Sequence, residues 1–130
     1  MDKNGRIDLH THSFFSDGVL LPSEMLRRAE ALGYAALAIT DHADVSNLDE
    51  IAAQLVRFSR AGLAGFSLHF VPGVEITDVP PEQIAPLARR AKRLGVRLVA
   101  ARVDLAADAV KALADEVELR AQPAVVVLVR

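Results

Sequence analysis

The stretch Ile7-Asp8-Leu9-His10-Thr11-His12 decides the fold and the site that this sequence predicts. Residues 6–10 alternate in polarity and are rich in strand-forming types, so we expect a β-strand there. Alternate side chains of a strand point to the same face, which places His10 and His12 together at the strand's end. Two imidazoles side by side, where a strand meets its loop, indicate a metal site.

Strands and helices alternate along the rest of the chain. Short, apolar and β-rich segments predict four more strands, at residues 35–40, 68–71, 96–101 and 124–129. Amphipathic segments predict four helices: one from Pro22 to before Gly33, one with Asn47 and Asp49 as candidate caps, one from Pro80 to before Gly95, and one over residues 105–115. Residues 117–121 fit a strand and a helix equally well. The pattern predicts an α/β fold with a mainly parallel sheet.

Composition narrows the classes of protein that fit. The 130 residues carry a net charge of -2, which gives no electrostatic basis for binding nucleic acid or an anionic membrane. The sequence has no cysteine, which excludes disulfides and thiolate metal sites and is typical of a cytoplasmic protein. No apolar run has the length of a membrane span or the form of a signal peptide. We therefore expect a single cytoplasmic domain over residues 1–130, with no nucleic-acid or membrane partner.

Further potential ligands lie where other strands are expected to end. The second predicted strand ends at Thr40-Asp41-His42, and the third ends near Glu75. Sites in parallel α/β folds gather at the C-terminal ends of strands, so His10, His12, His42 and Glu75 should converge. Imidazole and carboxylate ligands favour zinc, manganese or iron, and magnesium less. His69 lies inside an apolar run and is expected to be a core or surface residue.

Four segments carry a resemblance to a known family. They are Asp8-Leu9-His10-Thr11-His12, Ser16-Asp17-Gly18, Ile39-Thr40-Asp41-His42 and Val71-Pro72-Gly73-Val74-Glu75. Over about residues 7–99 the chain resembles the PHP (polymerase and histidinol phosphatase) family, and within it the small histidinol-phosphatase-like proteins. The resemblance implies a distorted (β/α) barrel that holds divalent ions at the strand ends and hydrolyses phosphoesters. It also implies that the metal ligands are His10, His12, Asp17, His42 and Glu75, with Glu75 bridging.

The chain also departs from the family pattern. No histidine follows His69, and residues 102–130 are divergent, so several ligands of the family are missing. One ion on His10, His12 and Glu75, with a weaker one on Asp17 and His42, is the arrangement that remains. The shortened fold is either a partial barrel, whose open edges would favour a homodimer, or an open flavodoxin-like sheet with helices on both faces.

The expected chemistry is attack of an activated water on the phosphorus of a small phosphorylated substrate. Asp17 and His42 are the candidate catalytic residues, and Asp17 or Asp41 could orient the water. A structural role, such as capping the loop, is the better expectation for Asp41, because it faces away from His42. Asp8 is either a hydrogen-bond acceptor for an imidazole or a buried structural acid.

Three hypotheses on function follow from these residues. The first is a metal-dependent phosphoesterase of PHP type with reduced activity. The second is a metal-binding but inactive fragment, truncated or engineered, that self-associates. The third is a folded scaffold whose former ligand positions bind no metal. The retained ligands weaken the third hypothesis, and the missing ones weaken the first.

Overall fold

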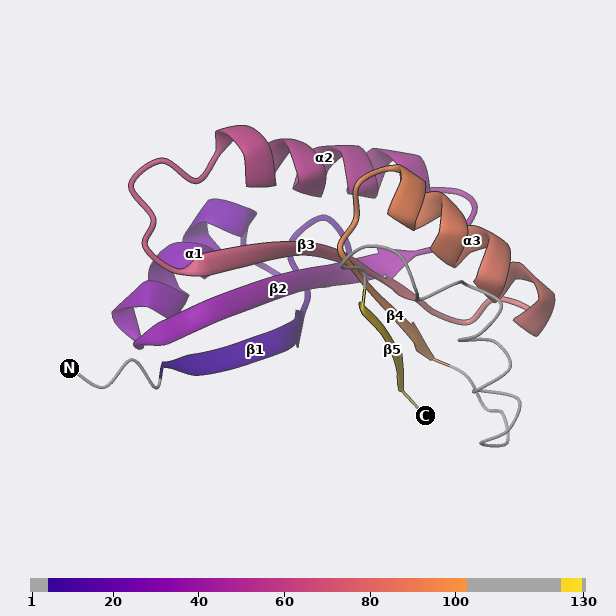
Figure 1. Cartoon of the computed structure of the whole chain (residues 1–130), viewed down its shortest axis with the longest axis horizontal. Coiled ribbons are helices and arrows are strands. Elements are labelled where there is room, and N and C mark those ends of the chain that lie inside the picture. Colours follow the sequence, from indigo (N-terminus) through magenta and orange to yellow (C-terminus); the bar gives the residue numbers. More distant parts are fainter. Residues whose placement is uncertain (1–4, 103–124, 130) are drawn as a thin grey trace.

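The computed structural model describes residues 5–102 and 125–129 of the chain (Figure 1). Strands and helices alternate in these residues, in the order β1 (Arg6–Thr11), α1 (Pro22–Ala31), β2 (Tyr34–Ala43), α2 (Leu48–Ala61), β3 (His69–Ile76), α3 (Pro81–Arg93), β4 (Leu98–Arg102) and β5 (Val125–Val129). The expected βα alternation is confirmed over this part of the chain. The predicted helix at residues 105–115 and the ambiguous segment 117–121 lie outside the described residues.

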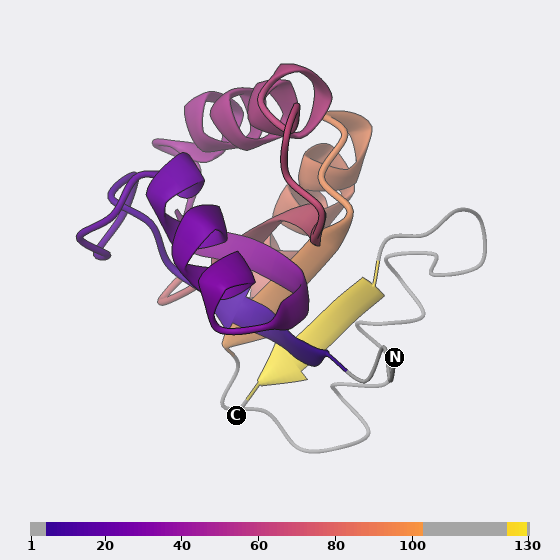
Figure 2. The same cartoon turned by 90° about the vertical axis from the view of Figure 1, so that its left-hand side faces the viewer.

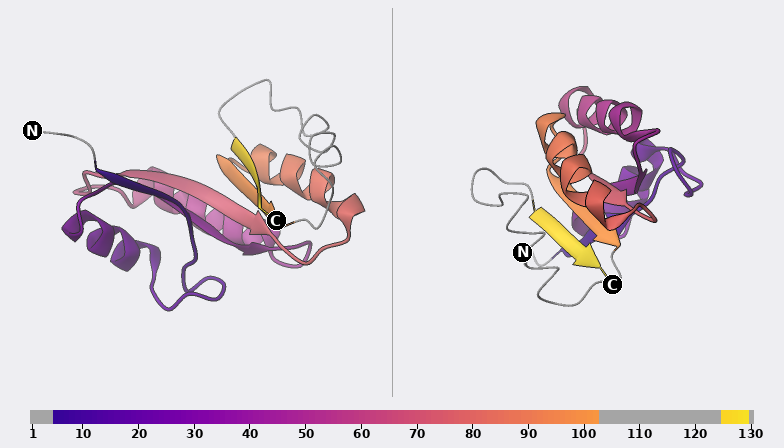
Figure 3. Two further views of the ribbon diagram at one scale, coloured as in Figure 1. Left: turned by 90° about the horizontal axis from the view of Figure 1, so that it is seen from below. Right: turned by 90° about the vertical axis from the view of Figure 1, so that its right-hand side faces the viewer.

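The five strands form one parallel sheet in the order β1-β2-β3-β4-β5. The sheet curls, and the helices α1, α2 and α3 lie around its outer face (Figures 1 and 2). Figure 3 shows the same arrangement from below and from the other end, with β5 at the edge opposite β1. A flavodoxin-like sheet would instead place β1 between β2 and β3 and would have helices on both faces. The partial-barrel prediction is therefore confirmed, and the flavodoxin-like alternative is wrong.

The two faces of the sheet have different partners. On the convex face, Ile39, Val74 and Val99 belong to the main core together with buried residues of all three helices. On the concave face, Ala38, Leu98 and Ala100 form a second, small buried cluster. Because side chains alternate along a strand, Thr40, His42 and Glu75 share the concave face with this second cluster. The convex face of the sheet therefore packs against the helices, and the concave face carries these polar side chains.

Helix starts and stops follow the expected signals in α1 and α3. α1 begins at Pro22, and the carboxylate of Glu24 accepts a hydrogen bond from the backbone N–H of Leu21 at 2.9 Å. Gly33 and Gly95, just beyond the two helices, have φ angles of 80° and 98°, a region that favours glycine.

At α2 the prediction is only partly right. Asn47 occupies the N-cap position, but its side chain accepts from the N–H of Asp44 and donates to the carbonyl of His42. Asp49 does not cap the helix; its carboxylate pairs with Arg90 of α3 at 2.5 Å. The candidate caps therefore tie the start of α2 to β2 and α3.

β3 differs most from the sequence-based expectation. It runs from His69 to Ile76, which extends past the predicted β-rich segment 68–71 and includes the expected strand end near Glu75, because β2 pairs with it up to Ala43↔Ile76. His69 is exposed, which makes it a surface residue. No helix in the described part of the chain has the length and apolarity that a bilayer span requires.

Candidate metal centre

All five predicted ligands meet at the C-terminal end of the sheet. His10 lies in β1, His12 directly after it, Asp17 in the following loop, His42 in β2 and Glu75 in β3. Their ligand atoms form two sets, each within 4.8 Å: His10, His12 and Glu75, and His12, Asp17 and His42. The pairing of β1 with β2 is irregular between Asp8 and Thr11, so His10 lies at a bulge of an edge strand.

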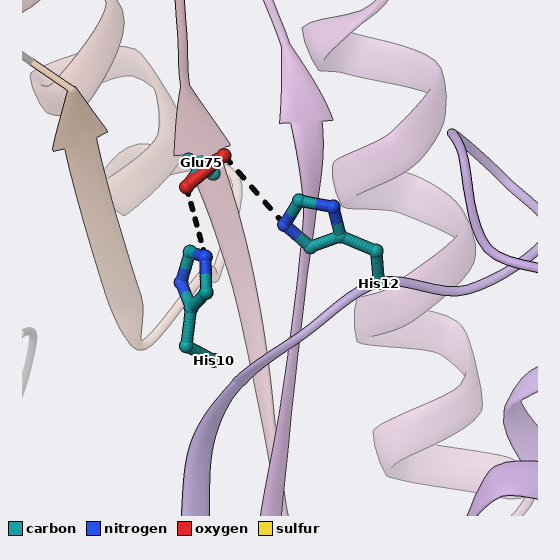
Figure 4. Close-up of side chains that lie close together, drawn as sticks. All are labelled: His10, His12 and Glu75. Atoms are coloured by element: carbon teal, nitrogen blue, oxygen red, sulfur yellow. Dashed lines mark ion pairs between the residues drawn. The ribbon is translucent and has the colours of Figure 1, made fainter.

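The first set is centred on a buried carboxylate. Figure 4 shows His10 and His12 pointing toward the two oxygens of Glu75. The Nε2 atom of His10 lies 2.9 Å from Oε2 of Glu75, and Nε2 of His12 lies 3.6 Å from Oε1. Ligand atoms that bind one ion at about 2.1 Å lie at most about 4.2 Å apart. Both distances to Glu75 lie within this limit, and the three ligand atoms lie within 4.8 Å of one another, so these side chains could hold a divalent cation.

His12 supplies the clearest sign of a missing positive charge. Its Nδ1 atom is 2.7 Å from the Oδ1 atom of Asp17, so the ring proton belongs on Nδ1 and is donated to that carboxylate. Its Nε2 atom is buried and has no hydrogen-bond partner among the described residues. A lone pair on Nε2 then faces the Glu75 carboxylate, with no proton between them. A cation would supply the partner that Nε2 of His12 lacks, and it would add to the contact that Oε1 of Glu75 makes with Nδ1 of His42.

Thr40 orients His10 in a similar way. The hydroxyl of Thr40 lies 3.3 Å from the carbonyl oxygen of Thr11, to which it can donate, and 3.2 Å from Nδ1 of His10. A hydroxyl that donates to the carbonyl accepts from Nδ1–H, which leaves the lone pair of His10 on Nε2. That nitrogen is the one beside Glu75.

The second set lies at the more open side of the centre. Asp17 is 61% exposed, and its Oδ2 atom lies 3.1 Å from Nε2 of His42. On the other side of the ring, Nδ1 of His42 contacts the hydroxyl of Thr77 at 2.6 Å and Oε1 of Glu75 at 3.1 Å. The hydrogen bond from His12 is the main reason that the pKa of Asp17 lies below its usual value, and His42 adds to it. Because His12 belongs to both sets, the two sets are not independent.

Two other acids are not aimed into the centre. Asp41 is fully buried on the convex side of β2, where Ser13 and Ser16 donate to its carboxylate. The structural role predicted for Asp41 is confirmed, and the suggestion that it orients a water is wrong. The carboxylate of Asp8 accepts from the backbone N–H of His10 at 3.0 Å, and among the described residues this contact takes the place of the predicted contact with an imidazole. Asp8 is half-buried, so it is not the fully buried acid of the other alternative either.

Thr40 and Thr77 are the site residues that sequence reasoning missed. Each lies two residues from a ligand on the same strand or its extension, Thr40 before His42 and Thr77 after Glu75. The period of two along a strand is the signal that could have identified them as concave-face neighbours of the ligands.

Comparison with known proteins agrees with this geometry. Residues 8–100 match the model of the PHP domain family. An uncharacterized protein of Methanocaldococcus jannaschii is 43% identical over 96 residues, which cover 72% of this chain and 44% of that protein. A 5'-3' exoribonuclease of Haemophilus influenzae is 36% identical over 126 residues, 85% of this chain and 46% of the relative.

A shorter match links the chain to a phosphatase. A 3',5'-nucleoside bisphosphate phosphatase of Chromobacterium violaceum is 42% identical over 71 residues, which cover 55% of this chain and 22% of the relative. The chain thus spans less than half the length of these relatives. The family match includes all five residues of the candidate metal centre. On the sequence match and the half-barrel together, the chain belongs to the PHP domain family.

Proposed function

We propose that the chain is a metal-dependent phosphoesterase of PHP type, in which His10, His12 and Glu75 hold the principal divalent cation. The observation that carries this proposal is the buried Nε2 atom of His12, which faces Glu75 and has no hydrogen-bond partner within residues 5–102 and 125–129. The ligands are nitrogen and oxygen atoms, which suit zinc, manganese or iron. A bound ion would supply Lewis acidity, lowering the pKa of water and neutralising charge on phosphoryl oxygens.

The protein's own side chains then orient the ligands and handle the proton. Thr40 holds the proton of His10 on Nδ1, and Asp17 holds that of His12 on Nδ1. His42 and Asp17 form the exposed side of the centre, with Nε2 and Oδ2 3.1 Å apart. We assign them the catalytic role of taking a proton from the attacking water, or of binding a second, weaker ion.

The substrate class proposed is a small phosphate ester. The relatives named as a nucleoside bisphosphate phosphatase and as an exoribonuclease support a nucleotide among the candidates. The net charge of -2 still favours a small nucleotide over a nucleic-acid chain for this protein. A 5'-phosphorylated RNA oligonucleotide, tested beside a nucleoside bisphosphate, distinguishes the two substrates.

A second candidate function is metal binding without turnover. The two ligand sets in the described residues share His12, so together they contain five side chains, too few for two separate ions with three ligands each. Phosphoryl transfer commonly relies on two ions that clamp the attacking and leaving oxygens. A centre that fills only the first set would bind metal and hydrolyse phosphoesters slowly.

Two measurements test the proposal. Isothermal titration of the metal-free protein with Zn²⁺ and Mn²⁺ should show binding that the His10→Ala variant loses. Phosphate release from an aryl phosphate and from the two nucleotide substrates should require the added metal and should disappear in the His42→Ala variant. Metal binding without phosphate release would favour the second candidate, and a chain that binds neither ion would exclude both.

A further inference from the structure

We infer that Asp41 is a positioning residue, which holds His12 and Asp17 in place through the turn between them. This inference rests on the proposed function, because it concerns the same metal centre. Asp41 lies on β2 between Thr40, which contacts His10, and His42, itself a proposed ligand. Asp41 faces the convex side of β2, whereas Thr40 and His42 face the concave side, so Asp41 can affect the centre only through other residues.

The carboxylate of Asp41 is fully buried and has three donors. Its Oδ1 atom accepts from the backbone N–H of Ser13 at 2.7 Å and from the hydroxyl of Ser16 at 2.6 Å. Its Oδ2 atom accepts from the hydroxyl of Ser13 at 2.6 Å. A buried carboxylate is stable only when it is compensated in this way, and hydrogen bonds to an ionised acceptor are the stronger kind. The carboxylate therefore fixes the two serines firmly.

The two serines are the chain neighbours of two proposed ligands. Ser13 follows His12 directly, and Ser16 precedes Asp17 directly. Between them the chain forms a tight turn, in which the carbonyl of Ser13 accepts from the N–H groups of Ser16 and Gly18 at 3.2 and 2.9 Å. The turn brings Oδ1 of Asp17 back to Nδ1 of His12, at 2.7 Å. Asp41 thus anchors both ends of the segment that carries these two ligands.

Gly18 closes the same turn at close range. A Cβ atom at this position would lie 2.2 Å from the carbonyl oxygen of His12, a distance that no side chain can occupy. The turn is therefore packed directly against the backbone of a proposed ligand. Loosening its anchor at Asp41 should displace His12 and Asp17 together, while His10 and Glu75, which are held by β1 and β3, keep their positions.

The test compares zinc affinity with stability. In the Asp41→Asn variant, we expect the affinity for Zn²⁺, measured by isothermal titration, to fall by about 10-fold to 100-fold, the size typical for groups that orient metal ligands. In the Ser16→Ala variant, we expect it to fall by about 10-fold. Circular dichroism at the same temperature confirms that each variant is folded. Ser23→Ala, at an exposed serine of α1, is the matched control for Ser16→Ala and should bind zinc like the wild type.

A core substitution separates positioning from general stability. Ile84→Val, in the buried face of α3, should lower the melting temperature and leave zinc affinity unchanged. In an Asp17→Asn background, Asp41→Asn should cost less affinity than it does alone, because both changes act on the same turn.

The outcomes distinguish this inference from the proposed function. A wild-type chain that binds no zinc overturns the proposed function, and this inference with it. A wild type that binds zinc, with Asp41→Asn and Ser16→Ala within twofold of it, overturns only the role of Asp41. If Asp41→Asn fails to fold, Ser16→Ala decides alone. Equal losses of affinity in Ile84→Val would show that zinc binding merely follows stability, which also overturns the inference.

Discussion

At the scale of single residues, the centre depends on hydroxyl groups as well as on its ligands. Four of the proposed ligands could be predicted from strand ends, through the alternation of His10 and His12 and the ends of β2 and β3. The fifth, Asp17, lies in a loop and was predicted only from the resemblance to the PHP family. Thr40 and Thr77 could not be predicted, because their contacts depend on which strands pair and in which register. A threonine in a strand has no chemical signature of its own.

Replacing Thr40 by valine should weaken metal binding without unfolding the chain. Valine has the same shape but no hydroxyl, so Nδ1 of His10 and the carbonyl of Thr11 lose their partner. We expect zinc affinity to fall about 10-fold in an isothermal titration. Thr11→Val is the matched control, since it removes a hydroxyl that donates to the carbonyl of Ala38 at 2.6 Å. An equal loss in the control would contradict a specific effect on His10.

Replacing Gly73 by alanine should destabilise the sheet beneath the centre. A Cβ atom there would lie 2.7 Å from Cγ2 of Thr40 and 3.0 Å from the carbonyl oxygens of Ile39 and Leu98. The backbone atoms cannot move away easily, so we expect the free energy of unfolding to fall by about 1–3 kcal/mol in urea titration. Adding Thr40→Ser removes Cγ2 and should restore part of this loss. Unchanged stability of Gly73→Ala would show that the concave face is less tightly packed than described.

At the scale of elements, the sequence predicted where the helices begin and end better than it predicted the length of β3. Proline and glycine mark the ends of α1 and α3 through local backbone preferences, which the sequence contains directly. The length of β3 depends on its pairing with β2 beyond Pro72 and Gly73, which interrupt the local pattern. The side chain of Asn47 contacts β2, another partner that a local pattern does not reveal.

Glu30 gives a prediction on pH at this scale, since it links the end of α1 to the segment before β3. Its carboxylate accepts from the N–H and the hydroxyl of Ser67 and from the N–H of Leu68. The backbone N–H of Ser67 is the main reason that the pKa of Glu30 lies below its usual value. A lowered pKa in the folded state stabilises the fold above the unfolded-state pKa, and this contribution is lost as the pH falls through the folded pKa.

The variant Glu30→Gln should therefore be less stable than the wild type at neutral pH. The difference in free energy of unfolding should shrink as the pH falls below 4.5, the usual pKa of a glutamate carboxyl, because the wild-type carboxylate is then protonated. Urea titrations between pH 3 and pH 7 measure the difference. Glu50→Gln, at an exposed position of α2, is the control. A difference that is constant over this range would contradict the assignment.

At the scale of the whole molecule, the order of the strands separates a half-barrel from an open sheet. Both folds have the same alternation of strands and helices, so the sequence pattern alone left them open. The observed order, with each strand beside its successor, places every described helix on one face. The extent of the domain beyond residue 102 stays a prediction.

Self-association is the prediction that belongs to this scale. β1 is an edge strand of the described sheet, and its Ile7 and Leu9 are 64% and 44% exposed. Open edges with apolar side chains favour pairing, so we expect a dimer at micromolar concentration in size-exclusion chromatography with light scattering. Leu9→Lys should shift it to a monomer. Leu32→Lys, at a leucine that is 67% exposed and directly follows α1, should not. A monomeric wild type would refute the paired half-barrel.

The run Thr40-Asp41-His42 has a consequence for engineering and evolution. Thr40 and His42 face the concave side of β2, and Asp41 faces the convex side. A single residue inserted or deleted upstream in β2 would reverse the side that each of them faces. His42 would then face the helices, and the carboxylate of Asp41 would face the concave side of the sheet. We therefore expect the loops to tolerate changes in length better than β2 does, and a library that aims to alter metal binding should vary loop length and keep the spacing within β2 fixed.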